Sequence, residues 1–106
     1  MAKHRLTWPW WRRWRIIATV PSVYDTPEHL RRKQAIIVGT ATSPKWLVFD
    51  CPCRQRHRVM VNLNPDRRPR WTVVKSSPLT LTPSVDETLP GSRCHYIIRN
   101  GHLHWA

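Results

Sequence analysis

Acidic residues, glycine and long apolar runs are all scarce in this chain of 106 residues. Only six Asp and Glu stand against 18 Lys and Arg, so the formal net charge is +12. A charge of this size attracts nucleic acid, acidic proteins and anionic membranes alike, and selects none of them. Three glycines against ten prolines predict short strands with stiff connections, and no glycine-rich phosphate-binding loop is present.

The chain also lacks the features of an exported or membrane-spanning protein. No apolar run approaches the roughly 18 residues of a transmembrane helix. The N-terminal segment is interrupted by Pro9 and by arginines, so it has no continuous apolar stretch of the signal-peptide kind. We therefore expect a cytoplasmic protein with reduced thiols. Three cysteines, two of them only two positions apart, favour a metal site or a reactive thiol over a disulfide framework.

Tryptophan, in contrast, is abundant, and four of the seven tryptophans lie in residues 1–15 among five Lys and Arg. This pattern is typical of segments that bind lipid interfaces, and equally of segments that stack on bases and bind phosphates. A third interpretation, which we favour, is an arm whose tryptophans pack on the domain, because the strand-like sequence RIIATV follows directly. We therefore divide the chain into a Trp/Arg-rich arm, residues 1–15, and a zinc-binding β domain, residues 16–106.

Short and alternating apolar runs predict a mainly β fold, a small antiparallel β domain of six to eight short strands. After RIIATV, the expected strands cover residues 35–40, 46–50, 57–63, 71–75 and 79–82. The sequence Thr26-Pro27-Glu28 is typical of a helix start, so we expect at most one short helix, near residues 27–33.

The C-terminal hairpin is the clearest predicted element. Asn100-Gly101 is the two-residue signal of a type I′ turn. The resulting register places Ile98 opposite Leu103 and Tyr96 opposite Trp105. One face, which we expect to be buried, then carries Cys94, Tyr96, Ile98, Leu103 and Trp105. The other face carries His95, Ile97, Arg99, His102 and His104.

Cysteines and histidines gather at two places in the sequence. Cys51 and Cys53 point to the same side of an extended chain, and Cys94 begins the C-terminal hairpin. Thiolate sulfur and imidazole nitrogen suit tetrahedral zinc. For the fourth position, spacing leaves His57 and His95 as rivals. His95 points away from Cys94 in a regular strand, so both can bind one ion only if the backbone is irregular there.

At these residues the chain resembles a bacterial family of small zinc-type domains, some of which are encoded beside genes for ubiquitin-like conjugation. The resemblance covers roughly residues 20–106. It rests on Cys51-Pro52-Cys53 with His57, Arg70-Trp71, Thr80-Leu81-Thr82-Pro83-Ser84-Val85, Cys94-His95-Tyr96, Ile98, Gly101 and Trp105-Ala106. The chain departs from the family where Arg54 replaces a glycine and where Gln55 stands at a third cysteine position. His57 is the candidate to fill that missing role.

The resemblance favours His95 as the fourth ligand. The expected zinc ligands are therefore Cys51, Cys53, Cys94 and His95, with His57 as a substitute ligand or a neighbour of the site. The resemblance also implies a role in a ubiquitin-like pathway, including a peptidase that matures or removes the modifier.

The sequence leaves the use of the zinc open. A closed four-ligand site would be structural and would make the domain an accessory or interaction module, bound to an acidic protein or to a ubiquitin-like protein. A site with an open position would make it a zinc-dependent peptidase, with Ser84, Asp86 and Glu87 nearby on a predicted loop. Non-specific nucleic-acid binding through the basic surface is the second alternative. No HExxH motif and no Ser/His/Asp arrangement stands out, so no catalytic residue is assigned.

Overall fold

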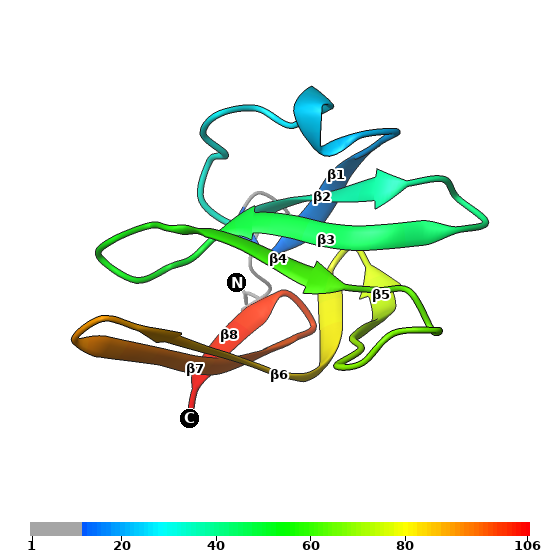
Figure 1. Ribbon diagram of the computed structural model, residues 1–106. Helices are drawn as coiled ribbons and strands as arrows, with labels where there is room; N and C mark the ends of the chain where they lie inside the picture. The colour runs from blue at the N-terminus through cyan, green and yellow to red at the C-terminus, as the bar shows by residue number, and fades with distance from the viewer. Residues whose placement is uncertain (1–11) are drawn as a thin grey trace, which may run out of the picture.

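The structure is a computed structural model that describes residues 12–106, and it consists of two four-stranded sheets (Figure 1). The N-terminal sheet contains, in spatial order, β1 (Arg15–Val20), β2 (Gln34–Gly39), β3 (Pro44–Asp50) and β4 (Arg58–Asn62). The C-terminal sheet contains β5 (Thr72–Ser76), β6 (Leu79–Leu89), β7 (Ser92–Arg99) and β8 (His102–Trp105). All paired strands are antiparallel except β1 and β2. The predicted mainly β fold is confirmed.

One core lies between the two sheets. The N-terminal sheet contributes the fully buried side chains of Leu47 and Phe49, and the C-terminal sheet contributes Leu79, Leu81 and Tyr96. Successive side chains of a strand point to opposite faces, so one face of each sheet meets the other in this layer. The other face of the N-terminal sheet buries Ile36, Val38 and Val48 with Leu30 in a second cluster. The outer face of the C-terminal sheet is thereby left to the intervening polar residues.

The predicted helical turn near residues 27–33 does not form. The only helical turn that lies entirely within residues 12–106 is the 3₁₀ turn η2 (Val23–Asp25). Arginines of β4 and of the loop before it bind carbonyls that a helix would need: Arg58 donates to Pro27 O and Glu28 O, and Arg56 donates to Leu30 O. Tertiary hydrogen bonds therefore override the local helix-start signal.

The C-terminal hairpin forms as the sequence predicts. Asn100 and Gly101 have φ values of 52° and 79°, as a type I′ turn requires. Ile98 pairs with Leu103 and Tyr96 with Trp105. The inward face is buried at Cys94, Tyr96 and Ile98, whereas Trp105 stays half exposed with its ring edge-on to Tyr96.

The end of the predicted arm enters the core. Trp14 is 3% exposed and packs edge-on against Phe49. Its backbone bonds to Gly101 O and Leu79 N, so it ties the start of β1 to the C-terminal sheet. The interpretation of the other tryptophans of the arm falls on residues 1–11, outside the described residues. Within residues 12–106 there is no helix with the length and apolarity needed to cross a membrane.

Candidate functional site

Three cysteines and one histidine converge where the two sheets meet. Cys51 and Cys53 leave the end of β3, His57 lies just before β4, and Cys94 comes from β7 of the opposite sheet. The loop turns back on itself through Arg56, whose φ is 48°, and closes with a hydrogen bond from Cys51 N to His57 O. The ligand atoms of the four side chains all lie within 4.8 Å of one another.

The geometry of this cluster fits a tetrahedral metal ion. Four donors at metal–sulfur distances of about 2.3 Å stand about 3.8 Å apart, close to the spacing seen here. His57 Nδ1 lies 3.4 Å from Cys53 Sγ, so it faces the cluster. His57 Nε2 is buried without a hydrogen-bond partner and lies 3.7 Å from Glu87 Oε1. A carboxylate behind the second nitrogen is the usual environment of a metal-binding histidine.

The thiols of the cluster differ in acidity. Burial raises the pKa of Cys53, but hydrogen bonds from Cys51 and from the backbone N–H groups of Arg56 and Gln55 outweigh it and lower the pKa to about 6. Burial and the neighbouring sulfurs raise the pKa of Cys94 to about 12. Burial also raises the pKa of Cys51. Without a cation one thiolate is readily formed, and a metal ion must displace the other protons.

Tyr96 supports the cluster from the core. Its side chain is fully buried, and its hydroxyl donates to Cys51 Sγ at 3.5 Å. Burial and the contact with Cys51 raise the pKa of Tyr96 well above its usual range, so the phenol stays a donor. A phenol that donates to sulfur stabilises the thiolate that metal binding needs.

A second pair of side chains meets on the opposite face of β7. His95 follows Cys94 directly, so its ring points away from the core, and its Nε2 lies 3.0 Å from Ser84 Oγ. Both residues are partly exposed. A serine hydroxyl within hydrogen-bond distance of an imidazole is the arrangement of an activated nucleophile and its general base.

An irregularity in β6 explains how Ser84 reaches His95. The β6–β7 register runs from Leu81↔Ile98 directly to Val85↔Tyr96, so three residues of β6 face one residue of β7. Pro83 lies within this bulge and has no N–H to donate to a ladder. Trp71 holds the bulge by donating its indole N–H to Ser84 O at 3.2 Å. Bulges often re-aim a side chain beside active sites.

The acids near the pair have other partners. Asp86 stands opposite His95 in the register, but both of its carboxylate oxygens accept hydrogen bonds from Arg93, at 2.8 and 2.6 Å. The Arg93 guanidinium thereby lowers the pKa of Asp86. Glu87 is on the inner face, beside His57. The outer face thus holds a Ser–His pair with an ionised carboxylate next to it.

The predicted site residues therefore separate into two groups. Cys51, Cys53 and Cys94 come together as expected, and His57 completes the group of donors. His95, the expected fourth ligand, instead contacts Ser84 across the bulge of β6. From the sequence we expected Ser84 near a zinc site and did not predict its contact with His95. Two sequence features could have predicted the contact between Ser84 and His95. His95 was expected on the outward face of its strand, and Pro83 and Ser84 follow directly after the expected strand of residues 79–82.

Comparison with protein families places this geometry in context. A family model described as "Bacterial ubiquitination-like system serine protease (BubE)" matches residues 22–106. Comparisons with curated proteins and with solved structures gave no match.

Proposed function

Because the chain belongs to the BubE family of bacterial ubiquitination-like systems, we propose that it is a serine peptidase that cleaves the bond after the C-terminal tail of a ubiquitin-like modifier. The observation that supports this proposal is the 3.0 Å contact between Ser84 Oγ and His95 Nε2 on the outer face of the C-terminal sheet. The description of the family as a serine protease agrees with this chemistry.

In the proposed reaction, Ser84 Oγ attacks the carbonyl carbon of the scissile bond while His95 Nε2 takes the hydroxyl proton. The tetrahedral intermediate collapses, the bond to the leaving amine breaks, and His95 returns the proton to that amine. Water, deprotonated by His95, then attacks the resulting ester, and the proton returns to Ser84 as the acid product leaves. A histidine used in this way must start in its neutral form.

The bulge also supplies a donor for the oxyanion of the intermediate. Ser84 has no register partner in β5 or in β7. In the proposed mechanism its own backbone N–H, beside its hydroxyl, binds the oxyanion, as a nucleophile's amide commonly does.

We further propose that zinc bound by Cys51, Cys53, His57 and Cys94 is structural. Four protein donors close a tetrahedral site and leave no position for a catalytic water. This arrangement favours the serine mechanism over a zinc-dependent peptidase. When bound, the metal would fix Cys94 and thereby the neighbouring residue of β7, His95, against Ser84.

The first experiment measures modification and cleavage with the same variants. A biotinylated fluorophosphonate should label the wild type, and Ser84→Ala and His95→Ala should abolish labelling. The same variants should lower kcat for a fluorogenic peptide of the modifier's tail by at least about 10³-fold. Ser92→Ala removes an exposed hydroxyl elsewhere on the C-terminal sheet and should change neither readout.

Three results would oppose the serine mechanism. Full peptidase activity in folded Ser84→Ala would exclude Ser84 as nucleophile and would favour a zinc-dependent mechanism. Labelling of wild type at a residue other than Ser84, found by mass spectrometry, would place the nucleophile elsewhere. Absence of all cleavage in metal-loaded protein would favour a non-catalytic interaction module.

A further inference from the structure

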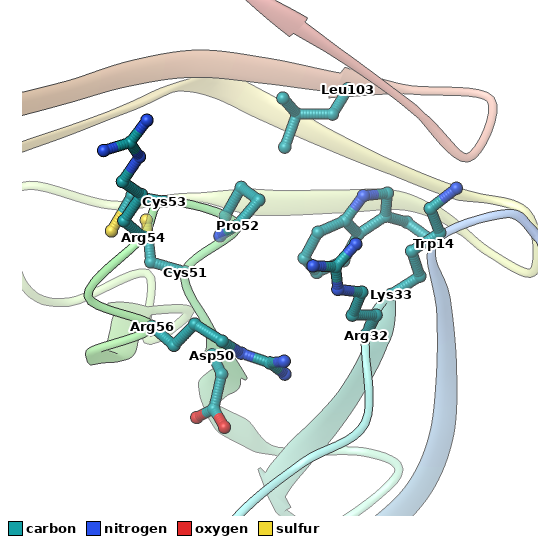
Figure 2. A pocket seen from close by; sticks show the side chains of 10 residues that line it. All are labelled: Trp14, Arg32, Lys33, Asp50, Cys51, Pro52, Cys53, Arg54, Arg56 and Leu103. Carbon is teal, nitrogen blue, oxygen red and sulfur yellow. The ribbon is translucent and has the colours of Figure 1, made fainter.

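A cationic cavity lies where β8 faces the loop of residues 51–57 between β3 and β4, which we call the cysteine loop (Figure 2). The cavity has a volume of about 310 Å³. Trp14, Pro52 and Leu103 contribute its apolar wall. Basic side chains reach it from two connections, Arg54 and Arg56 from the cysteine loop and Arg32 and Lys33 from the segment before β2. In Figure 2, Arg56 extends toward Arg32, whereas the sulfur atoms of Cys51 and Cys53 point away from Trp14.

A second hollow continues this cavity. The two share Arg32, Asp50, Arg54 and Arg56, and the second adds Arg31 and its neighbour Leu30. We call the combined area the cationic face, defined by Arg31, Arg32, Lys33, Arg54 and Arg56. Four of these side chains are exposed, and Lys33 is partly buried.

The one acid in these hollows does not neutralise the cationic face. Asp50 is only 7% exposed and is already bound, since Arg58 Nε donates to Oδ1 at 2.8 Å and Leu30 N donates to Oδ2 at 3.0 Å. Arg58 stands outside the cationic face and balances this carboxylate. The five basic residues therefore present an excess of positive charge to any ligand that enters.

The cationic face and Ser84 lie on opposite sides of the same narrow strip of sheet. Leu103 of β8 points inward and lines the cavity, whereas His104 points to the outer face that carries His95. β8 is the edge strand, and β6 lies two strands away. Two inter-strand spacings amount to about 10 Å, which about three to four extended residues can span.

We propose that the cationic face binds an acidic surface on the folded body of the ubiquitin-like substrate, whose extended tail then crosses the outer faces of β8 and β7 to reach Ser84. This inference rests on the proposed function. It assigns the affinity for the substrate to a surface separate from the Ser–His pair, so the body is recognised by charge and the tail by the sheet.

The shape and composition of the face favour a protein over other anions. A single phosphate or carboxylate would occupy one hollow, whereas two adjoining hollows with five cations fit several acids spread over a surface. Single-stranded nucleic acid is bound by exposed aromatic rings that stack on bases. Within residues 12–106, Trp14 is the one tryptophan that lines the cavity, and at 3% exposed it cannot stack in this way.

The test compares two substrates of the same enzyme. The first is the intact ubiquitin-like protein of the same system with a C-terminal reporter, and the second is a fluorogenic peptide of its tail alone. The double variant Arg54→Glu/Arg56→Glu should raise KM for the intact protein about tenfold or more and leave kcat unchanged. Cleavage of the tail peptide should stay within about twofold of wild type.

Matched variants separate this effect from general charge and from folding. Arg67→Glu/Arg68→Glu makes the same charge change on an exposed loop between β4 and β5 and should raise KM less than about twofold. Arg31→Glu/Arg32→Glu acts on the cationic face without touching the cysteine loop and should reproduce the effect of the first double variant. Metal content is measured for each variant.

Each result that departs from these expectations has its own interpretation. An equal rise of KM in the Arg67/Arg68 control, or an equal loss with the tail peptide, would overturn the docking surface. Strong inhibition of wild type by a 20-nucleotide DNA, relieved by the Arg54/Arg56 variant alone, would assign the face to nucleic acid instead. If wild type cleaves neither substrate, the proposed function fails, and fluorescence anisotropy of the labelled intact protein still tests the surface.

Discussion

Asp86 is the acid nearest to His95 in the β ladder, yet Arg93 rather than the imidazole takes both of its carboxylate oxygens. A catalytic triad needs its acid on the second imidazole nitrogen, and loss of such an acid costs about 10⁴-fold in kcat. Asp86 can act on His95 only through its charge, across an exposed and well-screened surface. The proposed catalytic unit is therefore better described as a Ser–His pair than as a triad.

We accordingly expect Asp86→Asn to lower kcat for the tail peptide by less than about tenfold, because the side chain orients no catalytic atom. The measurement is kcat beside His95→Ala, which should lose at least about 10³-fold. A loss in Asp86→Asn as large as that in His95→Ala would mean that the carboxylate turns to the imidazole when substrate binds.

The fourth metal ligand gives a second prediction for single residues. His57→Ala should reduce bound zinc, measured by elemental analysis, to well below one equivalent, because it removes a donor from the cluster. His95→Ala should keep its metal, since its ring contacts Ser84 on the other face. The reverse pattern would restore His95 as ligand and remove it as base.

How far the sequence predicts these residues depends on how local their geometry is. Cys51, Cys53 and Cys94 can be recognised as one site, because strand parity directs all three sulfurs inward. The choice between His57 and His95 depends on the positive φ of Arg56, which folds the loop back and which no sequence pattern specifies. The meeting of His95 with Ser84 depends on a shift of register.

At the scale of elements, the two glycine-containing turns of the C-terminal sheet differ in their surroundings. Gly91, between β6 and β7, has φ +78° and open space around it. Gly101, between β7 and β8, has φ +79°, and a Cβ there would lie 2.6 Å from Arg13 Cβ and 2.9 Å from Pro78 Cβ. The C-terminal hairpin turn is therefore fixed both by its backbone conformation and by the segment that precedes β1.

This difference predicts unequal costs for the same substitution. Gly91→Ala should lower the free energy of unfolding by about 1 kcal/mol, the cost of the left-handed backbone alone. Gly101→Ala should cost about 3 kcal/mol, because the contacts with Arg13 and Pro78 add to that strain. Urea unfolding of both variants measures the difference, and equal values would show that the neighbours of Gly101 yield without cost.

The strands themselves are largely predictable because their apolar alternation is local. The C-terminal hairpin, with its Asn-Gly turn, is right to the level of individual pairs. The exceptions are elements decided by distant contacts. Arginines from β4 and its preceding loop unwind the expected helix at residues 27–33, and β6 runs on through Pro83, where a strand was expected to end.

At the scale of the whole molecule, the cysteine cluster joins the two sheets. Cys51 and Cys53 belong to the connection between β3 and β4, and Cys94 belongs to β7. An ion held there would add its binding free energy to the packing of a small core. The cationic face begins on the same loop, so the candidate metal site, the core and the proposed docking surface share one structural support.

Removal of the metal should therefore weaken the entire domain. We expect a strong chelator to lower Tm by at least about 10 °C in scanning calorimetry. Under the same treatment, Cys51→Ser should show little further change, because it has already lost the ion. An unchanged Tm in chelated wild type would show that apolar packing alone holds the sheets together.

Acid should release the metal, because protons compete with the metal ion for the cysteine thiolates. Cys53, with its pKa lowered to about 6, is ionised near neutral pH, whereas the raised pKa of about 12 keeps Cys94 protonated until a metal displaces its proton. Affinity therefore falls as pH falls, and it falls more steeply below about pH 6, where Cys53 also binds a proton. A competition titration with a zinc indicator between pH 5 and 8 measures this slope.

The adjacency of Cys94 and His95 has a consequence for how the chain reaches its native state. A slip of β7 by one residue would exchange the two faces, placing the imidazole inside and the thiol outside. Such a chain would present two thiols and two imidazoles, those of His57 and His95, to the ion and would leave Ser84 without its proposed base. The register of β7 therefore decides two things at once: whether the third sulfur reaches the metal site, and whether a base faces the proposed nucleophile.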